Sequence, residues 1–408
     1  MNVRQINNFL FMLPFSAAYL IVGFVFLTTD VGIPEPTSLS AILISNTALA
    51  LTAPITSMYG AVLGSRLSSL SQLHMQSPRK TTNLLNFQML GPTFLLVGLS
   101  HFVLSLLSIN SFASAFNFEF LAFFEGLLIL WFALMWGLLL GTRYSIKFSA
   151  PISLVSTYLF LVLPITSSYT SWRHLVGLRH TCCRIDLVVA QNVQVATLGF
   201  YFTLILGLAL LAFQRKINKS LTVLLAAVFI LTSTVVGTST IPKHGFDAVQ
   251  DRPTSQLICE SNGVVEICVW PELVESLGKL VNESKSGFEE LSSTGLRLPE
   301  KFVTSSNVDL NQASFRLSLR ATPELQLASL LTGLVPEPTD NCLTKNFDAL
   351  RVSQLSKALV LHLAGTRFHL ELSEKVWKSE FRSLKQESEA TQVRFIEESS
   401  VAIRNCSN

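Results

Sequence analysis

Two ionisable residues, His101 and Glu125, stand inside long apolar stretches of the chain. A polar or charged group in such a segment is costly, so it usually faces a cavity, a partner helix or a substrate. The two residues are therefore a candidate intramembrane polar site. The alternative is structural: Glu125 reaches the outer membrane interface and His101 bonds a neighbouring helix, as interior polar groups often do.

A second group of candidates lies in the segment 167–194, where cations alternate with apolar residues. Arg173, Arg179 and Arg184 in this segment are candidates for contact with an anionic lipid or substrate. A plain cap over the helices is the alternative. Cys182 and Cys183 follow His180 too closely to supply well-spaced ligands for a tetrahedral metal site.

The motifs that drive chemistry elsewhere do not occur in the sequence. It has no G-x-x-x-x-G-K-[ST] phosphate loop, no G-x-G-x-x-G after a strand and no H-E-x-x-H pair. No serine, cysteine or carboxylate constellation indicates catalysis. We therefore expect a protein that is not an enzyme and needs no cofactor or metal, with any energy coming from a partner ATPase or an ion gradient.

The elements that must position these residues are membrane-spanning helices. Of the 408 residues, 49% are hydrophobic and only 14% are charged, whereas charged residues make up about 25% of an ordinary soluble domain. A span needs about 20 apolar residues, and seven stretches qualify, with the last the weakest: 9–27, 39–63, 85–107, 120–140, 150–166, 195–213 and 221–236. Residues 1–241 are therefore predicted to form an all-α membrane bundle.

Cations indicate the orientation of this bundle, because Lys and Arg concentrate in cytoplasmic loops. With the N-terminus in the cytoplasm, nine cations fall inside: Arg4, Arg66, Arg79, Lys80, Arg143, Lys147, Arg215, Lys216 and Lys219. Only Arg173, Arg179 and Arg184 then fall outside. We expect a multi-pass protein of the plasma membrane with an extracytoplasmic C-terminal domain and no nucleic-acid partner.

The cysteines agree with this topology, because disulfides persist only in an oxidising compartment. All six lie in segments predicted to be outside: Cys182, Cys183, Cys259, Cys268, Cys342 and Cys406. Six cysteines allow 15 pairings. A Cys342–Cys406 bridge would tie the last helices of the C-terminal domain to its middle.

The strongest local pattern in the C-terminal half is a hairpin around Asn262-Gly263. An Asn-Gly pair usually forms a two-residue turn, which would set Cys259 opposite Glu266. A four-residue loop, 262–265, instead sets Cys259 opposite Cys268 at a distance that suits a disulfide. We favour the four-residue loop.

After a linker at 242–255, residues 256–408 are predicted to form a helix-rich α+β domain with its own core. A half-buried strand is expected at 314–320, from the alternation of apolar and polar residues. Helices are expected at 271–291, 323–334, 347–363, 373–387 and 389–403.

Two features resemble a known family. Six spans, with a basic loop after the second and an irregular outside segment before the sixth, resemble the permease subunits of type-2 ABC exporters. The run Ile-Cys-Val-Trp-Pro-Glu at 267–272 is similar to a segment of uncharacterised outside domains appended to such permease-like proteins in Actinobacteria. The seventh span departs from the six-span pattern.

The resemblance implies an export or cell-envelope component with a separate ATPase subunit, which would dock at Arg66, His74, Arg79 and Lys80. The outside domain would then contact a lipid or peptide cargo or another envelope protein. The alternative is a non-transporting scaffold, receptor or immunity-type protein, whose outside domain binds a partner while the helices anchor it.

Overall fold

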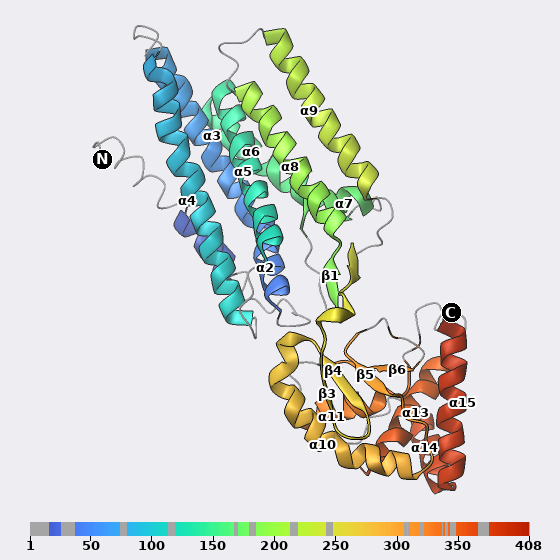
Figure 1. Ribbon diagram of the computed structural model, residues 1–408. Helices are drawn as coiled ribbons and strands as arrows, with labels where there is room; N and C mark the ends of the chain where they lie inside the picture. The colour runs from blue at the N-terminus through green and yellow to red at the C-terminus, as the bar shows by residue number, and fades with distance from the viewer. Residues whose placement is uncertain are drawn as a thin grey trace. The chain divides into compact units, whose positions relative to one another are not determined.

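A computed structural model describes most of the chain, namely residues 16–25, 37–73, 80–112, 119–166, 170–178, 185–212, 219–241, 248–305, 308, 311–317, 322–336, 338, 342, 348–365 and 375–407. The chain divides into two compact units, Met1–Gln250 and Asp251–Asn408 (Figure 1). The division falls inside the segment that was expected to be a linker.

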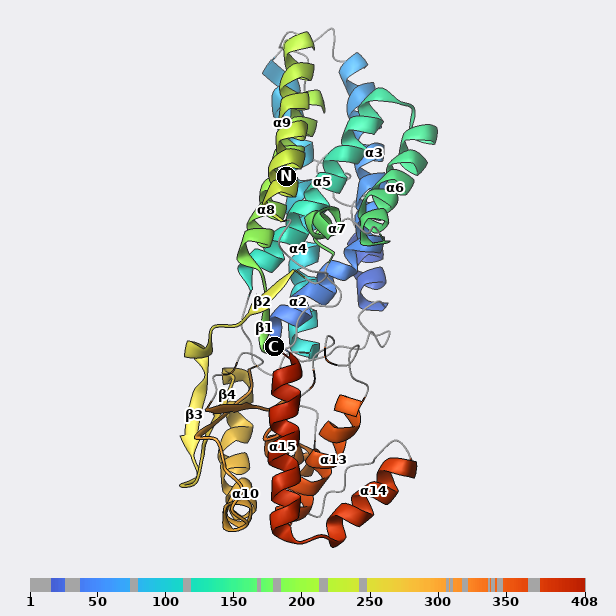
Figure 2. The ribbon, with the colours of Figure 1, turned by 90° about the vertical axis from the view of Figure 1, so that its right-hand side faces the viewer.

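The first unit is a bundle of helices that lie side by side in both views (Figures 1 and 2). A short helix, Ser16–Val25, precedes the others. They are α2 (Ser38–Thr47), α3 (Leu49–Leu73), α4 (Lys80–Phe112), α5 (Phe120–Arg143), α6 (Ile146–Val162), the 3-10 turn η2 (Leu163–Thr166), α7 (Thr170–Val176), α8 (Gln191–Ala212) and α9 (Lys219–Thr240). The strands β1 (Leu187–Val189) and β2 (Val249–Asp251) form a small ladder.

Four helices among the described residues are long and apolar enough to cross a membrane: Leu90–Ser111, Phe120–Arg143, Ile146–Thr166 and Gln191–Ala212. A fifth crossing results if α2 and α3 count as one bent span. The first and last predicted spans appear as the shorter apolar helices Ser16–Val25 and Val223–Ser239. The structure therefore supports a membrane protein but does not confirm seven crossings. Large apolar side chains on the bundle surface, such as Leu95 at 67% exposure and Phe148 at 66%, suit contact with lipid.

The helices α2 and α3 meet at Ala48 with a bend of 49°. Pro54 follows in the second turn of α3. Proline has no N–H for the carbonyl four residues earlier, and its ring crowds that turn, so kinks form on its N-terminal side. The bend places the polar C-terminal end of α2 inside the bundle, where Ser45 and Asn46 are fully buried.

The helices α3 and α5 pack along each other through small residues. A Cβ added to Gly60 or Gly64 would meet the carbonyl oxygen of Leu134 or Leu138. On the facing helix α5, a Cβ at Gly137 would meet the carbonyl oxygen of Ser57, and a Cβ at Gly141 would meet the carbonyl oxygen of Ala61. Each helix thus carries a G-x-x-x-G pair, which lets two membrane helices approach backbone to backbone.

The second unit combines one sheet with helices (Figures 1 and 2). The strands follow the order β3 (Ile258–Ser261), β4 (Glu266–Val269), β5 (Lys301–Val303), β6 (Gln312–Ser314), with the first pair antiparallel and the others parallel. The helical elements are η4 (Thr254–Gln256), η5 (Pro271–Leu273), α10 (Val274–Ser293), α11 (Pro323–Thr332), α13 (Asp348–Leu363), α14 (Lys375–Gln386) and α15 (Glu389–Ser407). Trp270, Phe288 and Phe302 are fully buried in the core.

The hairpin has the four-residue loop. Cys259 lies opposite Cys268, and the two form a disulfide. The side chain of Asn262 stabilises the four-residue loop over the two-residue turn. Its Oδ1 accepts hydrogen bonds from the backbone N–H groups of Val264 and Val265, both at 2.9 Å. Gly263 takes the positive φ of 89° that the loop needs. A second disulfide joins Cys342 to Cys406, as expected.

The predicted helices of this unit are present within a few residues of their expected bounds, and Thr322 caps α11 as the sequence suggests. The strand expected at 314–320 is confirmed at Ser314 and wrong at 315–317, while residues 318–320 lie outside the described residues. The ladder occupies Gln312–Ser314, while Phe315 and Leu317 are buried in irregular backbone. The alternation correctly indicated that Phe315 and Leu317 are buried. The Phe315 N–H still donates to the Val303 carbonyl of β5 at 3.0 Å, but the regular strand ends at Ser314.

The described part of the expected linker, 248–255, holds regular structure and specific contacts. Within the second unit, the Arg252 guanidinium lies 3.0 Å from the Glu272 carboxylate and 4.6 Å from the centre of the Trp270 ring. Its Nε donates to Gln256 at 2.8 Å. Arg252 therefore holds the start of this unit against Trp270 and η5.

Candidate polar site in the helix bundle

His101 lies on α4 and is fully buried. Its Nδ1 is 3.1 Å from the Tyr19 hydroxyl on helix Ser16–Val25, and its ring stacks on Phe123 of α5 with centroids 5.2 Å apart. A hydroxyl that donates to Nδ1 leaves the proton of a neutral imidazole on Nε2. The histidine thus bonds a neighbouring helix, as the structural alternative expected, and turns Nε2 toward α5.

Asn46, at the end of α2, reaches the same place on α5. Its Nδ2 donates to the Ala122 carbonyl at 2.8 Å. A Cβ on Gly126 would meet both Asn46 Oδ1 and His101 Nε2, so the absent side chain of Gly126 leaves the room that these two polar groups fill.

Glu125 is fully buried and faces a different neighbour. A Cβ on Gly177 would meet its Oε1, which places the segment after α7 against this carboxyl group. The structural alternative expected Glu125 to reach the outer membrane interface. Instead, other parts of the chain cover its side chain. The positive φ of Gly177, 78°, allows the tight turn there.

The segment that covers Glu125 is held by the last helices of the bundle. The Tyr201 hydroxyl donates to the Val176 carbonyl at 2.9 Å, and the Thr197 hydroxyl donates to that of His174 at 3.2 Å. Leu175 packs against Gly237 of α9. The 170–178 segment thus enters the bundle rather than lying over it.

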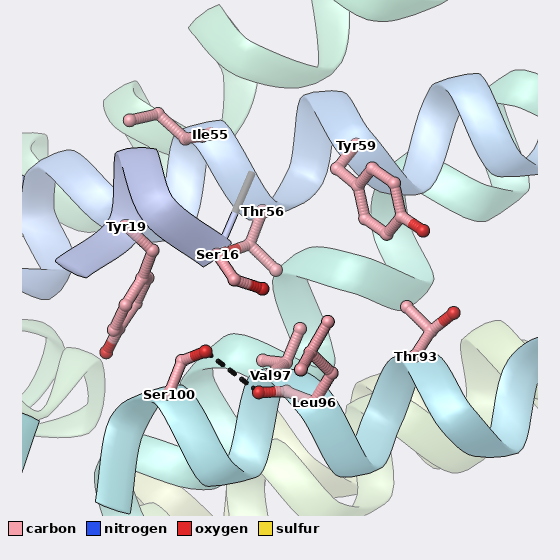
Figure 3. Close-up of a pocket in the computed structure, with 9 residues that line it drawn as sticks. All are labelled: Ser16, Tyr19, Ile55, Thr56, Tyr59, Thr93, Leu96, Val97 and Ser100. Atoms are coloured by element: carbon pink, nitrogen blue, oxygen red, sulfur yellow. Dashed lines mark hydrogen bonds between the residues drawn. The ribbon is translucent and has the colours of Figure 1, made fainter. Parts of the chain in front are cut away.

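A small cavity of about 20 Å³ lies near the histidine, between helix Ser16–Val25, α3 and α4 (Figure 3). Six hydroxyl-bearing side chains line it together with three aliphatic ones: Ser16, Tyr19, Thr56, Tyr59, Thr93 and Ser100, with Ile55, Leu96 and Val97. A water molecule needs about 10–15 Å³ and two or more polar partners. The cavity therefore suits a single water molecule next to Tyr19, not a large ligand.

These contacts place an imidazole, an amide and a carboxyl group on one end of α5, His101 and Asn46 against Gly126 and Glu125 against Gly177. His101 and Asn46 thus share one position against α5, while Glu125 lies at the same end of α5 against a different chain segment. The sequence identified His101 and Glu125 but missed Tyr19, Asn46 and the two glycines. A lone amide within an apolar run was the available signal for Asn46.

The structure describes some of the other predicted site residues and not others. Arg66 is exposed near the end of α3, and Lys80 begins α4, whereas His74 and Arg79 lie outside the described residues. Arg173 is buried on α7 at 8% exposure. Arg179, Arg184, Cys182 and Cys183 also lie outside the described residues. In the second unit Glu266 lies close to Cys259 and Cys268, but the disulfide removes both thiolates as metal ligands.

Comparison with known proteins identifies only part of the second unit. Residues 267–406, about a third of the chain, match the model of a domain of unknown function, DUF7224. No curated protein and no solved structure matches the chain.

Proposed function

We propose that this protein is a non-enzymatic, integral membrane component of an export or cell-envelope complex, the permease-like subunit of an ABC-type transporter that works with a separate ATPase. The observation that carries the proposal is the burial of three polar groups, Asn46, His101 and Glu125, at one end of α5, with Asn46 next to the bend between α2 and α3. Ionisable groups inside a membrane bundle are costly to retain, and they commonly mark a substrate or ion pathway. Interrupted helices are a common setting for such pathways.

The proposed topology has seven crossings, a cytoplasmic N-terminus and an extracytoplasmic second unit. The two disulfides support an oxidising environment for that unit. The partner ATPase would dock between the end of α3 and the start of α4, where Arg66 is exposed, and the outside domain would contact the cargo or an envelope protein.

The test is purification of the full chain from its native membrane in mild detergent, followed by identification of co-purified subunits and measurement of ATP hydrolysis. Arg66→Glu should reduce the recovered nucleotide-binding subunit at least severalfold. Lys147→Glu is the matched control, because it reverses another exposed cation that is predicted to be cytoplasmic but lies outside the proposed docking segment.

The alternative, a membrane-anchored scaffold or receptor, is favoured by one observation. The family match lies within the second unit, at residues 267–406, so this part of the chain recurs in other proteins. A chain that purifies without any nucleotide-binding subunit, yet retains an envelope protein through residues 251–408, would replace the exporter proposal with this one.

A further inference from the structure

The helix α14 carries a row of cations on its exposed face. Lys378, Arg382 and Lys385 are all exposed, and their spacing of four and three residues puts them on one side of the helix, over about 10 Å. The other exposed residues of the described face are Ser379, Ser383 and Gln386. We call Lys378, Arg382 and Lys385 the basic row.

The opposite face of α14 is committed to the domain core. Phe381 and Leu384 pack against the cluster around Leu355 and Ala358 of α13. Glu380, the one carboxylate in the sequence of α14, has an oxygen 3.9 Å from Arg351 Nε of α13. Packing therefore fixes which way the helix faces and leaves the basic row without a carboxylate of its own helix beside it.

The basic row differs from the lysines of α10 in its ion pairing. On α10, Lys279 pairs with Glu283 at 3.6 Å, and Lys285 pairs with Glu289 at 4.0 Å. Within the part of the chain that the structure describes, none of the three cations of the basic row forms an ion pair.

The second unit as a whole is acidic: residues 251–408 hold 17 Lys/Arg and 21 Asp/Glu, a net charge of −4. Glu374 and Glu387 flank α14 in the sequence, but the exposed residues described on α14 itself include no carboxylate. Such a face on an acidic domain is complementary to an anionic partner.

We propose that the basic row binds the anionic lipid headgroups of the membrane in which the bundle lies. A row on one convex helix face fits a flat, negatively charged surface better than it fits a small ligand. Each cation near such a surface contributes about a fivefold gain in partitioning, hence about a hundredfold for three. That is weak for a free protein, but the chain tethers the domain to its membrane, and tethering raises the effective concentration of the surface.

The test is lysine labelling of the full chain in lipid nanodiscs. The nanodiscs contain phosphatidylcholine alone or phosphatidylcholine mixed with phosphatidylglycerol, an uncharged reagent acetylates the amines, and mass spectrometry gives a rate for each lysine. In anionic nanodiscs at low salt, Lys378 and Lys385 should react about fivefold or more slowly than in neutral ones. Lys279 and Lys285 serve as internal controls whose rates should not change, and high salt should remove the difference.

A charge reversal sharpens the result. Arg382→Glu should restore fast labelling of Lys378 and Lys385 in anionic nanodiscs, whereas Arg394→Glu, a reversal of an exposed arginine on α15, should not. Equal rates in the two lipid compositions would overturn the proposal, and so would equal protection of the α10 lysines. Protection produced by inorganic phosphate in neutral nanodiscs would also overturn it, because the site would then bind a free anion. None of these outcomes depends on whether the bundle transports a substrate.

Discussion

At the scale of single residues, the buried histidine of the bundle has a hydrogen-bond partner on another helix. Tyr19 and His101 hydrogen-bond across two helices, and both are buried. A buried polar group that loses its partner costs about 1–3 kcal/mol, whereas replacement of both partners by apolar groups costs less. Unfolding free energies of the single and double variants can therefore show whether the Tyr19–His101 hydrogen bond stabilises the bundle.

We expect Tyr19→Phe and His101→Phe each to destabilise the detergent-solubilised chain, and the double variant to cost less than the sum of the two. The coupling should be about 0.6 kcal/mol and at most about 1.7 kcal/mol, the average and the maximum found for hydrogen bonds between membrane helices. Thermal unfolding of the four proteins gives the value. Tyr19→Phe combined with Ser233→Ala is the control, since the Ser233 hydroxyl donates to the Ile230 carbonyl of its own helix, away from the Tyr19–His101 pair. Additive effects for Tyr19 and His101 would contradict the bond.

The two disulfides of the second unit close loops of different length, with sequence separations of 9 and 64. Loop-closure entropy predicts a loss of about 3 kcal/mol for the Cys259→Ser/Cys268→Ser variant and about 4 kcal/mol for Cys342→Ser/Cys406→Ser. Urea unfolding of the full chain, followed by brief proteolysis of the second unit, measures both. Equal losses, or a larger loss for the hairpin pair, would show that strain or packing outweighs chain entropy here.

At the scale of elements, the seam of small residues holds α3 and α5 together. Gly137→Ala places a Cβ against the Ser57 carbonyl, so the two helices must move apart. Overpacking of this kind costs about 1–3 kcal/mol, and the melting temperature in detergent should fall accordingly. Gly199→Ala on α8 is the control, because nothing lies within 4 Å of its added Cβ and alanine favours a helix. Similar melting temperatures for the two variants would mean that the seam relaxes without cost.

At the scale of the whole molecule, the chain joins an apolar bundle to a disulfide-containing domain. The family match lies within the second unit, and the buried polar groups His101, Asn46 and Glu125 lie within the first. The side of the membrane on which the second unit lies decides whether it meets a partner in the cytoplasm or in the envelope.

We expect Cys259 of the full chain in intact cells to react with a membrane-impermeant maleimide after mild reduction, because the proposed topology places it outside. Mass spectrometry of the recovered protein identifies the labelled cysteine. Permeabilised cells provide the control for accessibility. Labelling that requires permeabilisation would place the second unit in the cytoplasm and would reverse the topology.

The sequence alone determined the features that depend on neighbouring residues. Span-length apolar runs predicted the membrane bundle, and helix starts such as Thr322-Pro323 predicted elements of the second unit. Cysteine spacing predicted the register that joins Cys259 to Cys268. The alternation at 314–320 correctly indicated burial of Phe315 and Leu317 but not where the strand ends, which is Ser314, because the extent of a strand depends on the neighbouring strand and not on the local pattern alone.

Only the tertiary structure decided what surrounds the polar residues of the bundle. In a membrane helix both lipid and neighbouring helices are apolar, so hydrophobic periodicity does not record which faces meet. His101 meets Tyr19 and Asn46, and Glu125 meets Gly177, through chain segments that are far apart in sequence. The site that began as two isolated residues, His101 and Glu125, therefore acquired its partners from the fold, through two glycines whose missing side chains leave space for them.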